Sequence, residues 1–485
     1  IYTLSLHDAL PISGLESQAM RATASKANLL LKMTPTLRLN AAHCFDLSFA
    51  VAARLRRTYG NDADKFALAA NNRDNYTAAA LNLWQLWRET ADTAILARLF
   101  AFLEQTKAQA LGDALQQQRA LALTGIPDTL LAREENLRLK AADAAKDLKE
   151  KELSGDSIKV VQLKDHAFRQ EKAYADFLRA LELQHPQFRQ YTQAGIAANL
   201  PDIQSALPDS TALLSWYDAG DRYLCVAVRR DGLSAYEVPR DSVLDGTLFR
   251  FLGTLADNSR QETDPTSYFS EAHFLFQKLL PEAAISGTRS LMIIPDRRLA
   301  YLPFEALLTA SHTGNYANAP YLLRSKTVQY AWSATLLTLP AAKAVSENGL
   351  LQIAPFVESA RDGLAPLPNS RHDAPASVGA TVLDGADATA DAFLNRAPRH
   401  NVLHLSTHAD AGGREVPGIE LYDRRLTLPE IYAQRFHASL VSLSACETGS
   451  GQFAEGEGVL SLARAFAYAG AQSLVASHWA VNERS

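Results

Sequence analysis

The sequence is poor in cysteine and carries no strong charge of either sign. Its three cysteines, Cys44, Cys225 and Cys446, lie far apart among 485 residues, and no two of them form a C-x-x-C pair. This spacing argues against a disulfide framework or a zinc knuckle and is typical of a reducing compartment. A net charge of -5 gives no basic field of the kind that polyanion binding requires, so we do not expect direct binding of nucleic acid.

Long apolar runs are also missing. No run reaches the roughly 18 residues that a membrane-spanning helix needs, and the N-terminus lacks the charged start and apolar stretch of a secretion signal. We therefore expect a cytoplasmic protein without membrane contact. The chain begins with Ile1, and residues 2–12 resemble translated sequencing adapter more than coding sequence. Residues 1–13 are therefore treated as a non-native segment and left out of the fold prediction.

A chain of this length is expected to hold two to four domains. The first part of the chain has a helical pattern almost throughout. In residues 14–125, Ala-rich faces alternate with large apolar residues at three- and four-residue spacing. This pattern indicates degenerate repeats of the tetratricopeptide (TPR) kind, although no strict 34-residue consensus fits. Residues 126–199 indicate a long helical hairpin that turns near residues 154–156. The hairpin's mixed charges fit a partner-binding surface or simply a solvated helical face.

The composition changes at residue 200, where short apolar runs begin. Residues 212–217, 222–228 and 233–238 predict an antiparallel meander, because Gly-containing turns separate them. Further apolar runs joined by helical stretches predict one mainly parallel sheet with helices on both faces, in an α/β domain that extends from residue 200 to 485. These further runs are residues 290–295, 328–332, 350–354, 380–383, 402–407, 438–445 and 472–477.

Two of these runs end next to residues that can do acid, base or nucleophilic chemistry. His408 follows the run 402–407, and Cys446 follows the run 438–445. Residues 428–435 predict a helix between the two runs, with Pro429 near its first turn. Ligands of such sheets lie beyond the carboxyl ends of the strands. We therefore expect His408 and Cys446 to meet at one edge of the sheet.

The three cysteines differ in what their surroundings predict. Cys446 is followed by a loop with four glycines, whose backbone N–H groups could stabilise a tetrahedral intermediate formed by a thiolate nucleophile. A packed thiol near a turn fits the spacing equally well, because a single cysteine needs a histidine brought close by the fold. Cys225 lies within a predicted strand among apolar residues and is expected to be inert.

No motif for a metal or a cofactor stands out. His404 and His408 form H-x-x-x-H, but on a strand they would lie about 13 Å apart, too far to share a zinc ion. We therefore expect His404 to be a packed histidine and His408 to be available for chemistry. No lysine occurs in residues 441–485, which excludes a Walker A site in the glycine loop, and no G-x-S-x-G elbow is present.

Several ordered motifs resemble the CHAT family, whose caspase-like domains are attached to tetratricopeptide repeats and are related to caspases, gingipains and separase. The motifs are HLSTH at 404–408, LSACETG at 443–449, GEGVLSLARAFAYAG at 456–470 and VASHWAV at 475–481. LPFEAL at 302–307 also resembles an earlier motif of that domain. The resemblance spans most of the chain and is strongest from residue 402 onward.

The resemblance implies a cysteine peptidase with a His-Cys dyad, carried by His408 and Cys446. It also implies an oxyanion hole made by the backbone N–H groups of Ala409 and Cys446. Related peptidases commonly have Gly in place of Ala409, and Ala keeps the N–H donor but loses the conformational freedom of Gly. His478 stands where the family often has Leu. The resemblance further implies closing helices beyond Ser485, whose loss is expected to weaken folding and activity.

We therefore expect a cysteine endopeptidase that cleaves protein substrates without a cofactor or a metal, with a protein partner bound by the TPR-like helices. The alternative is a scaffold in which the caspase-like domain is inactive and serves protein–protein interaction. The presence of both His408 and Cys446 favours the enzyme. Cleavage specificity cannot be predicted, because no single Asp or Arg is placed well enough to define a pocket.

Overall fold

The computed structural model describes residues 11–59, 62–193, 199–339, 349–358, 361, 363–372, 379–410, 415–446 and 448–479. Residues 1–10 of the adapter-like segment and residues 480–485 lie outside these ranges. Packing divides the chain into two compact units. The first unit comprises Ile1–Ala110, Ala197–Thr338 and Ala454–Gly458, and the second comprises Leu111–Ile196, Leu339–Phe453 and Val459–Ser485. Whether residues 14–125, 126–199 and 200–485 are separate domains stays a prediction.

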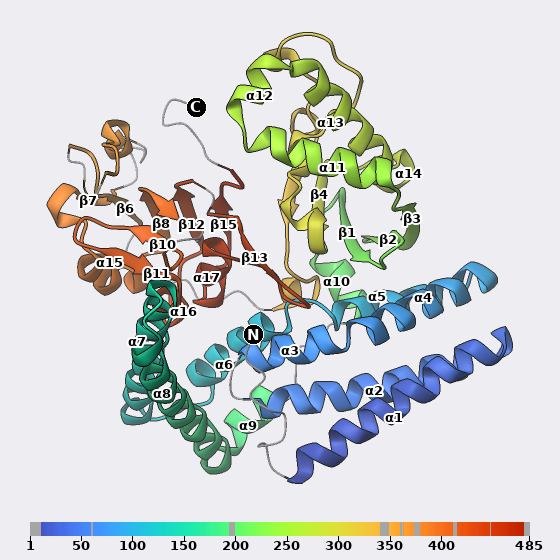
Figure 1. The fold of residues 1–485 in the computed structure, drawn as a ribbon, viewed down its shortest axis with the longest axis horizontal. Helices are drawn as coiled ribbons and strands as arrows, with labels where there is room; N and C mark the ends of the chain where they lie inside the picture. The colour runs from blue at the N-terminus through green and yellow to red at the C-terminus, as the bar shows by residue number, and fades with distance from the viewer. Residues whose placement is uncertain are drawn as a thin grey trace. The chain divides into compact units, whose positions relative to one another are not determined.

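The first unit begins with helices and continues with a five-stranded sheet and its covering helices (Figure 1). Its helices are α1 (Pro11–Met33), α2 (Arg38–Thr58), α3 (Asp62–Asn71), α4 (Arg73–Thr90), α5 (Thr93–Glu104), α10 (Leu200–Ala206), α11 (Ser242–Leu255), α12 (Asn258–Thr263), α13 (Pro265–Leu279) and α14 (Glu282–Ile285). Its strands are β1 (Thr211–Asp218), β2 (Arg222–Arg229), β3 (Gly232–Pro239), β4 (Ser290–Ile294) and β5 (Thr327–Tyr330).

Helices cover both faces of this first sheet, whose strand order is β3-β2-β1-β4-β5. Side chains alternate along β1 and β2, so Trp216 and Tyr223 pack against α11 and α13, whereas Tyr217 and Leu224 pack against α2, α4 and α5. The strands β1 to β3 are antiparallel, as the meander predicts, and β4 and β5 join them in parallel. The N-terminal helices therefore share a hydrophobic core with the sheet.

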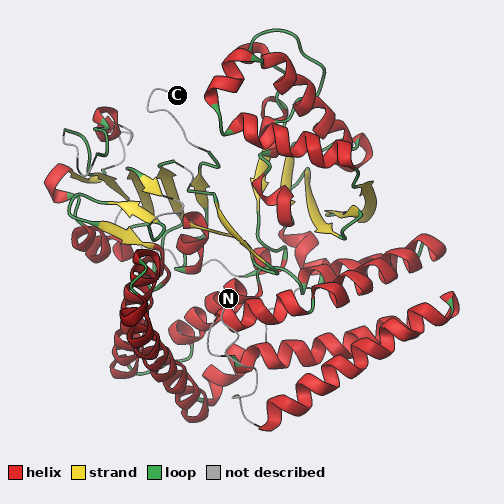
Figure 2. Cartoon of the chain, in the orientation of Figure 1, coloured by secondary structure: helices red, strands yellow, loops and turns green. Residues whose placement is uncertain are grey.

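The second unit combines a helical hairpin with an α/β sheet (Figure 2). Its helices are α7 (Asp128–Ser154), α8 (Ser157–Gln184), α9 (Pro186–Gln193), α15 (Ala390–Arg396), α16 (Leu428–Tyr432) and α17 (Leu462–Tyr468), with most of α6 (Gln109–Leu123). Its strands are β6 (Leu350–Ala354), β7 (Thr381–Asp384), β8 (Val402–Ser406), β9 (Ala409–Asp410), β10 (Gly418–Glu420), β11 (Arg425–Thr427), β12 (Leu440–Ser444) and β15 (Leu474–Ala476). Two further strands, β13 (Gly451–Ala454) and β14 (Gly458–Ser461), pair with each other.

The second sheet is parallel throughout, in the order β15-β12-β8-β6-β7. Alternate apolar residues of β6, β8 and β12 pack against α15, α16 and α17. The predicted helix between β8 and β12 is α16, which begins with Pro429 in its first turn and a capping box between Thr427 and Glu430. The helix lies between the parallel strands β8 and β12 in the sequence, as in a βαβ crossover.

All the strand runs predicted after residue 200 are strands, but they divide between two sheets. Residues 290–294 and 327–330 join the meander because β1 pairs in parallel with β4, through partners such as Leu213 and Met292. The later runs form the second sheet. An all-helical N-terminal region followed by an α/β part with a parallel sheet is the predicted fold class, and it is confirmed.

The predicted hairpin of residues 126–199 is also present, with α7 packed along α8 (Figure 1). The two helices join at Gly155, which ends α7 with a positive φ of 75°. This left-handed conformation favours glycine and explains the turn predicted at residues 154–156. Within the described ranges, no helix combines the length and the apolar character that crossing a bilayer requires.

Candidate active site

His408 and Cys446 follow neighbouring parallel strands of the second sheet. The register pairs Ser406, the last residue of β8, with Ser444, the last residue of β12. The backbone N–H of Thr407 also donates a hydrogen bond to Ser444 O at 3.3 Å, which extends the pairing beyond the strand ends. His408 and Cys446 thus hold equivalent positions, each two residues beyond a paired serine. This is the edge where parallel sheets carry ligands.

The imidazole of His408 is held by a backbone carbonyl and an aromatic ring. Nε2 of His408 lies 2.8 Å from Ala365 O. A carbonyl oxygen only accepts, so this contact fixes the proton on Nε2 and leaves Nδ1 of the neutral ring as the acceptor. The buried ring of Phe356 lies 5.2 Å from the imidazole, centroid to centroid. Ala365 could not be identified as a site residue from sequence, because it contacts His408 through its backbone carbonyl, which every residue type has.

The backbone N–H of Ala409 points away from the neighbouring strand. β9 and β10 are antiparallel, with Ala409 opposite Ile419. The N–H of Glu420 donates to His408 O at 2.9 Å, which makes Ala409 and Ile419 a pair without mutual hydrogen bonds. The ladder with β10 therefore does not use the N–H of Ala409.

The loop that carries Cys446 is tied to the chain that follows β15. Ser477 Oγ donates to Ala445 O at 2.6 Å, and the N–H of Gly449 donates to Ser477 O at 2.7 Å. Thr448 Oγ1 accepts from the N–H of Ser477 at 3.2 Å. A Cβ at position 449 would lie 3.1 Å from Ser477 O, so glycine permits this close approach. These bonds fix the backbone on both sides of the half-buried Cys446.

The other residues considered from sequence lie within strands or shortly after them. Cys225 is fully buried in β2, and burial raises the pKa of its thiol to about 12. His404 lies on β8, half-buried, with Nε2 2.9 Å from Ser406 Oγ. His478 follows β15, and its carbonyl accepts from Ser450 Oγ at 2.6 Å. Among the residues that the structure describes, no group of three or more His, Cys, Asp or Glu side chains could hold a metal ion.

A pair in the first unit has the chemistry of a serine nucleophile and a lysine base but lacks access. Lys107 Nζ donates to Ser215 Oγ at 2.6 Å, and burial lowers the pKa of Lys107. Glu104 lies beside both and accepts from Ser333 Oγ at 2.7 Å. Ser215 is fully buried in the sheet and Lys107 is 7% exposed, so no substrate can reach them. The pair is part of a buried polar network of the core.

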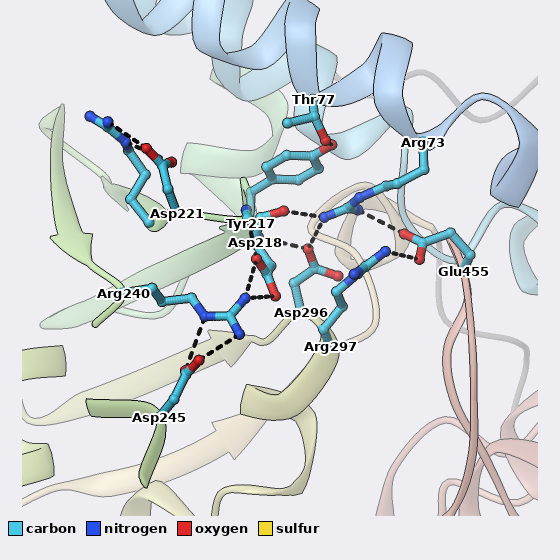
Figure 3. Close-up of polar contacts among 12 residues, drawn as sticks. Arg73, Thr77, Tyr217, Asp218, Asp221, Arg240, Asp245, Asp296, Arg297 and Glu455 are labelled. Atoms are coloured by element: carbon cyan, nitrogen blue, oxygen red, sulfur yellow. Dashed lines mark hydrogen bonds and ion pairs between the residues drawn. The ribbon is translucent and has the colours of Figure 1, made fainter. Parts of the chain in front are cut away.

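A second polar cluster of the first unit holds the segment Ala454–Gly458, which follows the Cys446 loop in sequence. Figure 3 shows Arg73 and Arg297 both pointing toward the carboxylate of Glu455, and each lies 2.8 Å from a different oxygen of it. Arg73 also donates to Asp296 at 3.2 Å. Each carboxylate of the cluster faces a guanidinium, as expected of ion pairs that fix structure. No sequence pattern indicated this cluster, because its members come from distant segments.

The C-terminal part of the chain matches a known family, and the match agrees with the motifs that contain His408 and Cys446. Residues 270–485 match the family model of the CHAT domain. These residues form a CHAT domain. The match includes His408, Ala409 and Cys446, together with β4, β5 and the whole second sheet. No curated protein matches the chain.

The CHAT domain is a caspase-like domain of the cysteine peptidase type, so the predicted resemblance is confirmed at the level of the family. The three predicted site residues lie at the carboxyl edge of β8 and β12. The Ala365 carbonyl, Phe356 and the strands β9 to β11 complete their surroundings and were missed by the sequence analysis. The sequence 418–427 carries one usable signal for the missed strands, an alternation of apolar and polar residues across a short turn.

Proposed function

We propose that the CHAT domain is a cysteine endopeptidase in which Cys446 is the nucleophile and His408 the acid–base group. The observation that carries the proposal is the register of β8 and β12, which gives both residues equivalent positions beyond the paired Ser406 and Ser444. A nucleophile and a base carried by neighbouring strand ends is an arrangement suited to acyl transfer. The Ala365 carbonyl engages Nε2, so Nδ1 is the nitrogen of His408 that handles the proton.

The proposed reaction begins when Nδ1 of His408 takes the proton of the Cys446 thiol, which gives a thiolate and a protonated imidazole. In the first half of the reaction, Sγ of this thiolate attacks the carbonyl carbon of the scissile peptide bond. A C–S bond forms, and the π electrons of the carbonyl move to its oxygen, where the N–H groups of Ala409 and Cys446 bind the negative charge. When the intermediate collapses, the C–N bond breaks and Nδ1–H of His408 protonates the leaving amine. A thioester on Cys446 remains.

In the second half, a water molecule attacks the thioester carbon while His408 Nδ1 accepts its proton. The C–S bond then breaks, and the carboxylic acid product leaves Cys446 as a thiolate. The step needs no metal or organic cofactor, because the thiolate, the imidazole and two backbone donors supply the nucleophile, the proton transfer and the charge stabilisation. The Ala365 carbonyl supports the protonated imidazole by accepting from Nε2–H.

The test is cleavage of a peptide library by the full chain and by Cys446→Ala. We expect the substitution to lower kcat by at least about 1,000-fold, because no other thiol is placed at the site. Cys44→Ala is the matched control, since this half-buried cysteine lies in α2 of the first unit, and it should cleave as the unsubstituted chain does. Cleavage by Cys446→Ala at the unsubstituted rate would rule the mechanism out.

We also propose that the N-terminal helices bind a protein partner. The support is a set of large apolar side chains on α1 and α2 that stay exposed, including Leu29 at 59%, Met33 at 64% and Leu47 at 61%. The same surface would serve the alternative function, a scaffold with an inactive CHAT domain. An electrophilic peptide probe separates the two: labelling of Cys446 that is lost in His408→Ala supports the enzyme, and no labelling supports the scaffold.

A further inference from the structure

The surroundings of His408 converge on one carboxylate that the sequence motifs do not include. Glu420 is the last residue of β10 and is 4% exposed. Its backbone N–H donates to His408 O at 2.9 Å, and its own carbonyl accepts from Thr407 Oγ1. The main chain of Glu420 therefore fixes the two residues that follow β8.

The side chain of Glu420 reaches the segment that presents Ala365. Its carboxylate oxygen Oε2 forms an ion pair with Arg361, and the Arg361 guanidinium also donates to Leu421 O at 2.7 Å. Arg361 begins a turn closed by the bond from Leu364 N–H to Arg361 O at 2.8 Å. Ala365 is the next residue. Holding the guanidinium of Arg361 thus holds the turn that points the Ala365 carbonyl at Nε2 of His408.

The same carboxylate is also held from its other side. Oε1 of Glu420 lies 2.5 Å from Nε of Arg425, whose Nη1 is 2.7 Å from Glu415 and 3.4 Å from Asp410. A buried carboxylate that faces two guanidinium groups keeps a fixed direction, because rotation would break charge-assisted bonds. Glu420 therefore couples β9 and β10 to the turn before Ala365.

We propose that Glu420, through its ion pair with Arg361, is a positioning residue that keeps His408 in the Nε2–H form by fixing the Ala365 carbonyl. The inference rests on the proposed function, because the Nε2–H form is what leaves Nδ1 for proton transfer. Glu420 touches neither the substrate nor the reacting atoms, so its effect is on orientation. Substitution should therefore act on kcat and leave KM nearly unchanged.

The test compares Glu420→Gln with Glu415→Gln in the full chain. Both remove one carboxylate that contacts Arg425, but the Glu415 side chain is 66% exposed, whereas the buried Glu420 also pairs with Arg361, so Glu415→Gln is the matched control for charge. The first readout is the ¹⁵N spectrum of histidine-labelled protein, with His408 assigned by comparison with His408→Gln. We expect the Nε2–H signal of His408 to give way to the Nδ1–H form in Glu420→Gln and to persist in Glu415→Gln.

The second readout is peptide cleavage, where we expect kcat to fall about 10- to 100-fold in Glu420→Gln with KM within about 2-fold. Arg361→Met is a second variant, since it breaks the same pair from outside the strands, and it should reproduce both effects. An unchanged tautomer in Glu420→Gln and Arg361→Met would overturn the inference. The spectrum does not depend on turnover, so this failure is distinct from failure of the peptidase proposal, which would appear as cleavage by Cys446→Ala.

Discussion

At the scale of single residues, burial separates the cysteines more sharply than sequence context does. Cys225 lies within an apolar strand and Cys446 follows one. Cys225 is nevertheless fully enclosed by the core of the first sheet, whereas Cys446 is half-buried at the end of its strand. A thiol reacts as its thiolate, so the enclosed residue is protected twice, by exclusion of reagent and by the cost of forming a buried charge.

This difference predicts the outcome of alkylation. The pKa of Cys225 is raised to about 12 by burial, so at pH 8 almost no thiolate is present in the folded protein. We expect iodoacetamide to leave Cys225 unmodified in the native protein and to modify it after denaturation in urea, as measured by peptide mass spectrometry. Cys446 should be modified under native conditions. Native labelling of Cys225 at the rate seen in urea would show that the first sheet opens.

The candidate site also shows which residues a sequence can reveal. The placement of His408 and Cys446 at one edge of the sheet was predictable, because each follows an apolar strand run and parallel strands bring their carboxyl ends to one edge. Ala365 was not, because a backbone carbonyl leaves no mark on residue choice. Glu420 was not, because a carboxylate becomes informative only once Arg361 is known to face it. Pairing between distant segments is decided by tertiary structure.

At the scale of elements, the crossover from β8 to β12 holds more than the predicted helix. The strands β9, β10 and β11 form a small antiparallel sheet before α16 begins. They are only two or three residues long, too short for a periodic pattern to identify, and their pairing is local. These strands orient Ala409 and Glu420, so the part of the crossover that the sequence analysis missed is the part that surrounds the candidate site.

The crossover helix α16 is packed against α7, and a buried carboxylate fastens the two regions. Glu134 of α7 is 3% exposed and accepts from Arg435 at 2.5 Å, from Arg138 at 3.2 Å and from Tyr174 OH at 2.7 Å. Glu134→Ala should lower the free energy of unfolding by about 2 to 3 kcal/mol, because it leaves two partly buried guanidinium groups, 13% and 24% exposed, without their partner.

Hydrogen exchange gives the local measurement for this prediction. Amides of α7 and α16 should exchange faster in Glu134→Ala, since the ion pair joins the helix to the segment that follows α16. Glu135→Ala is the control, because the neighbouring carboxylate is exposed and its loss should change exchange little. Equal exchange in the two variants would mean that apolar packing alone holds the hairpin in place.

At the scale of the whole molecule, the fold class followed from the pattern of helical stretches and apolar runs, whereas the division into two sheets did not. The run 290–294 has the apolar character of any buried parallel strand, so its sequence cannot say which sheet it joins. This run pairs with β1, because β1 is an edge strand of the meander β1–β3 and one of its sides is available for pairing. The family match begins at residue 270, within α13, and therefore covers only two strands of this first sheet.

The shared core of the first unit makes a prediction about fragments. Trp84, Phe100 and Phe49 of the N-terminal helices pack on the same face of the sheet as Tyr217 and Ile294. A fragment of residues 199–485 keeps the strands of both sheets but lacks the N-terminal helices that cover this face. The face would then be a large exposed apolar patch, which promotes association. We expect the fragment to be oligomeric, to bind a hydrophobic dye and to lose the near-ultraviolet circular dichroism of its buried Trp216.

Adding residues 11–110 as a separate chain provides the control for that experiment, because it returns α1 to α5 to the uncovered face. Light scattering should then report a smaller species, and dye binding should fall. If the fragment of residues 199–485 is instead monomeric with the near-ultraviolet spectrum of the full chain, the helices are dispensable for the sheet. The shared core would then be a docking contact, and the boundary predicted at residue 200 would mark an independent domain.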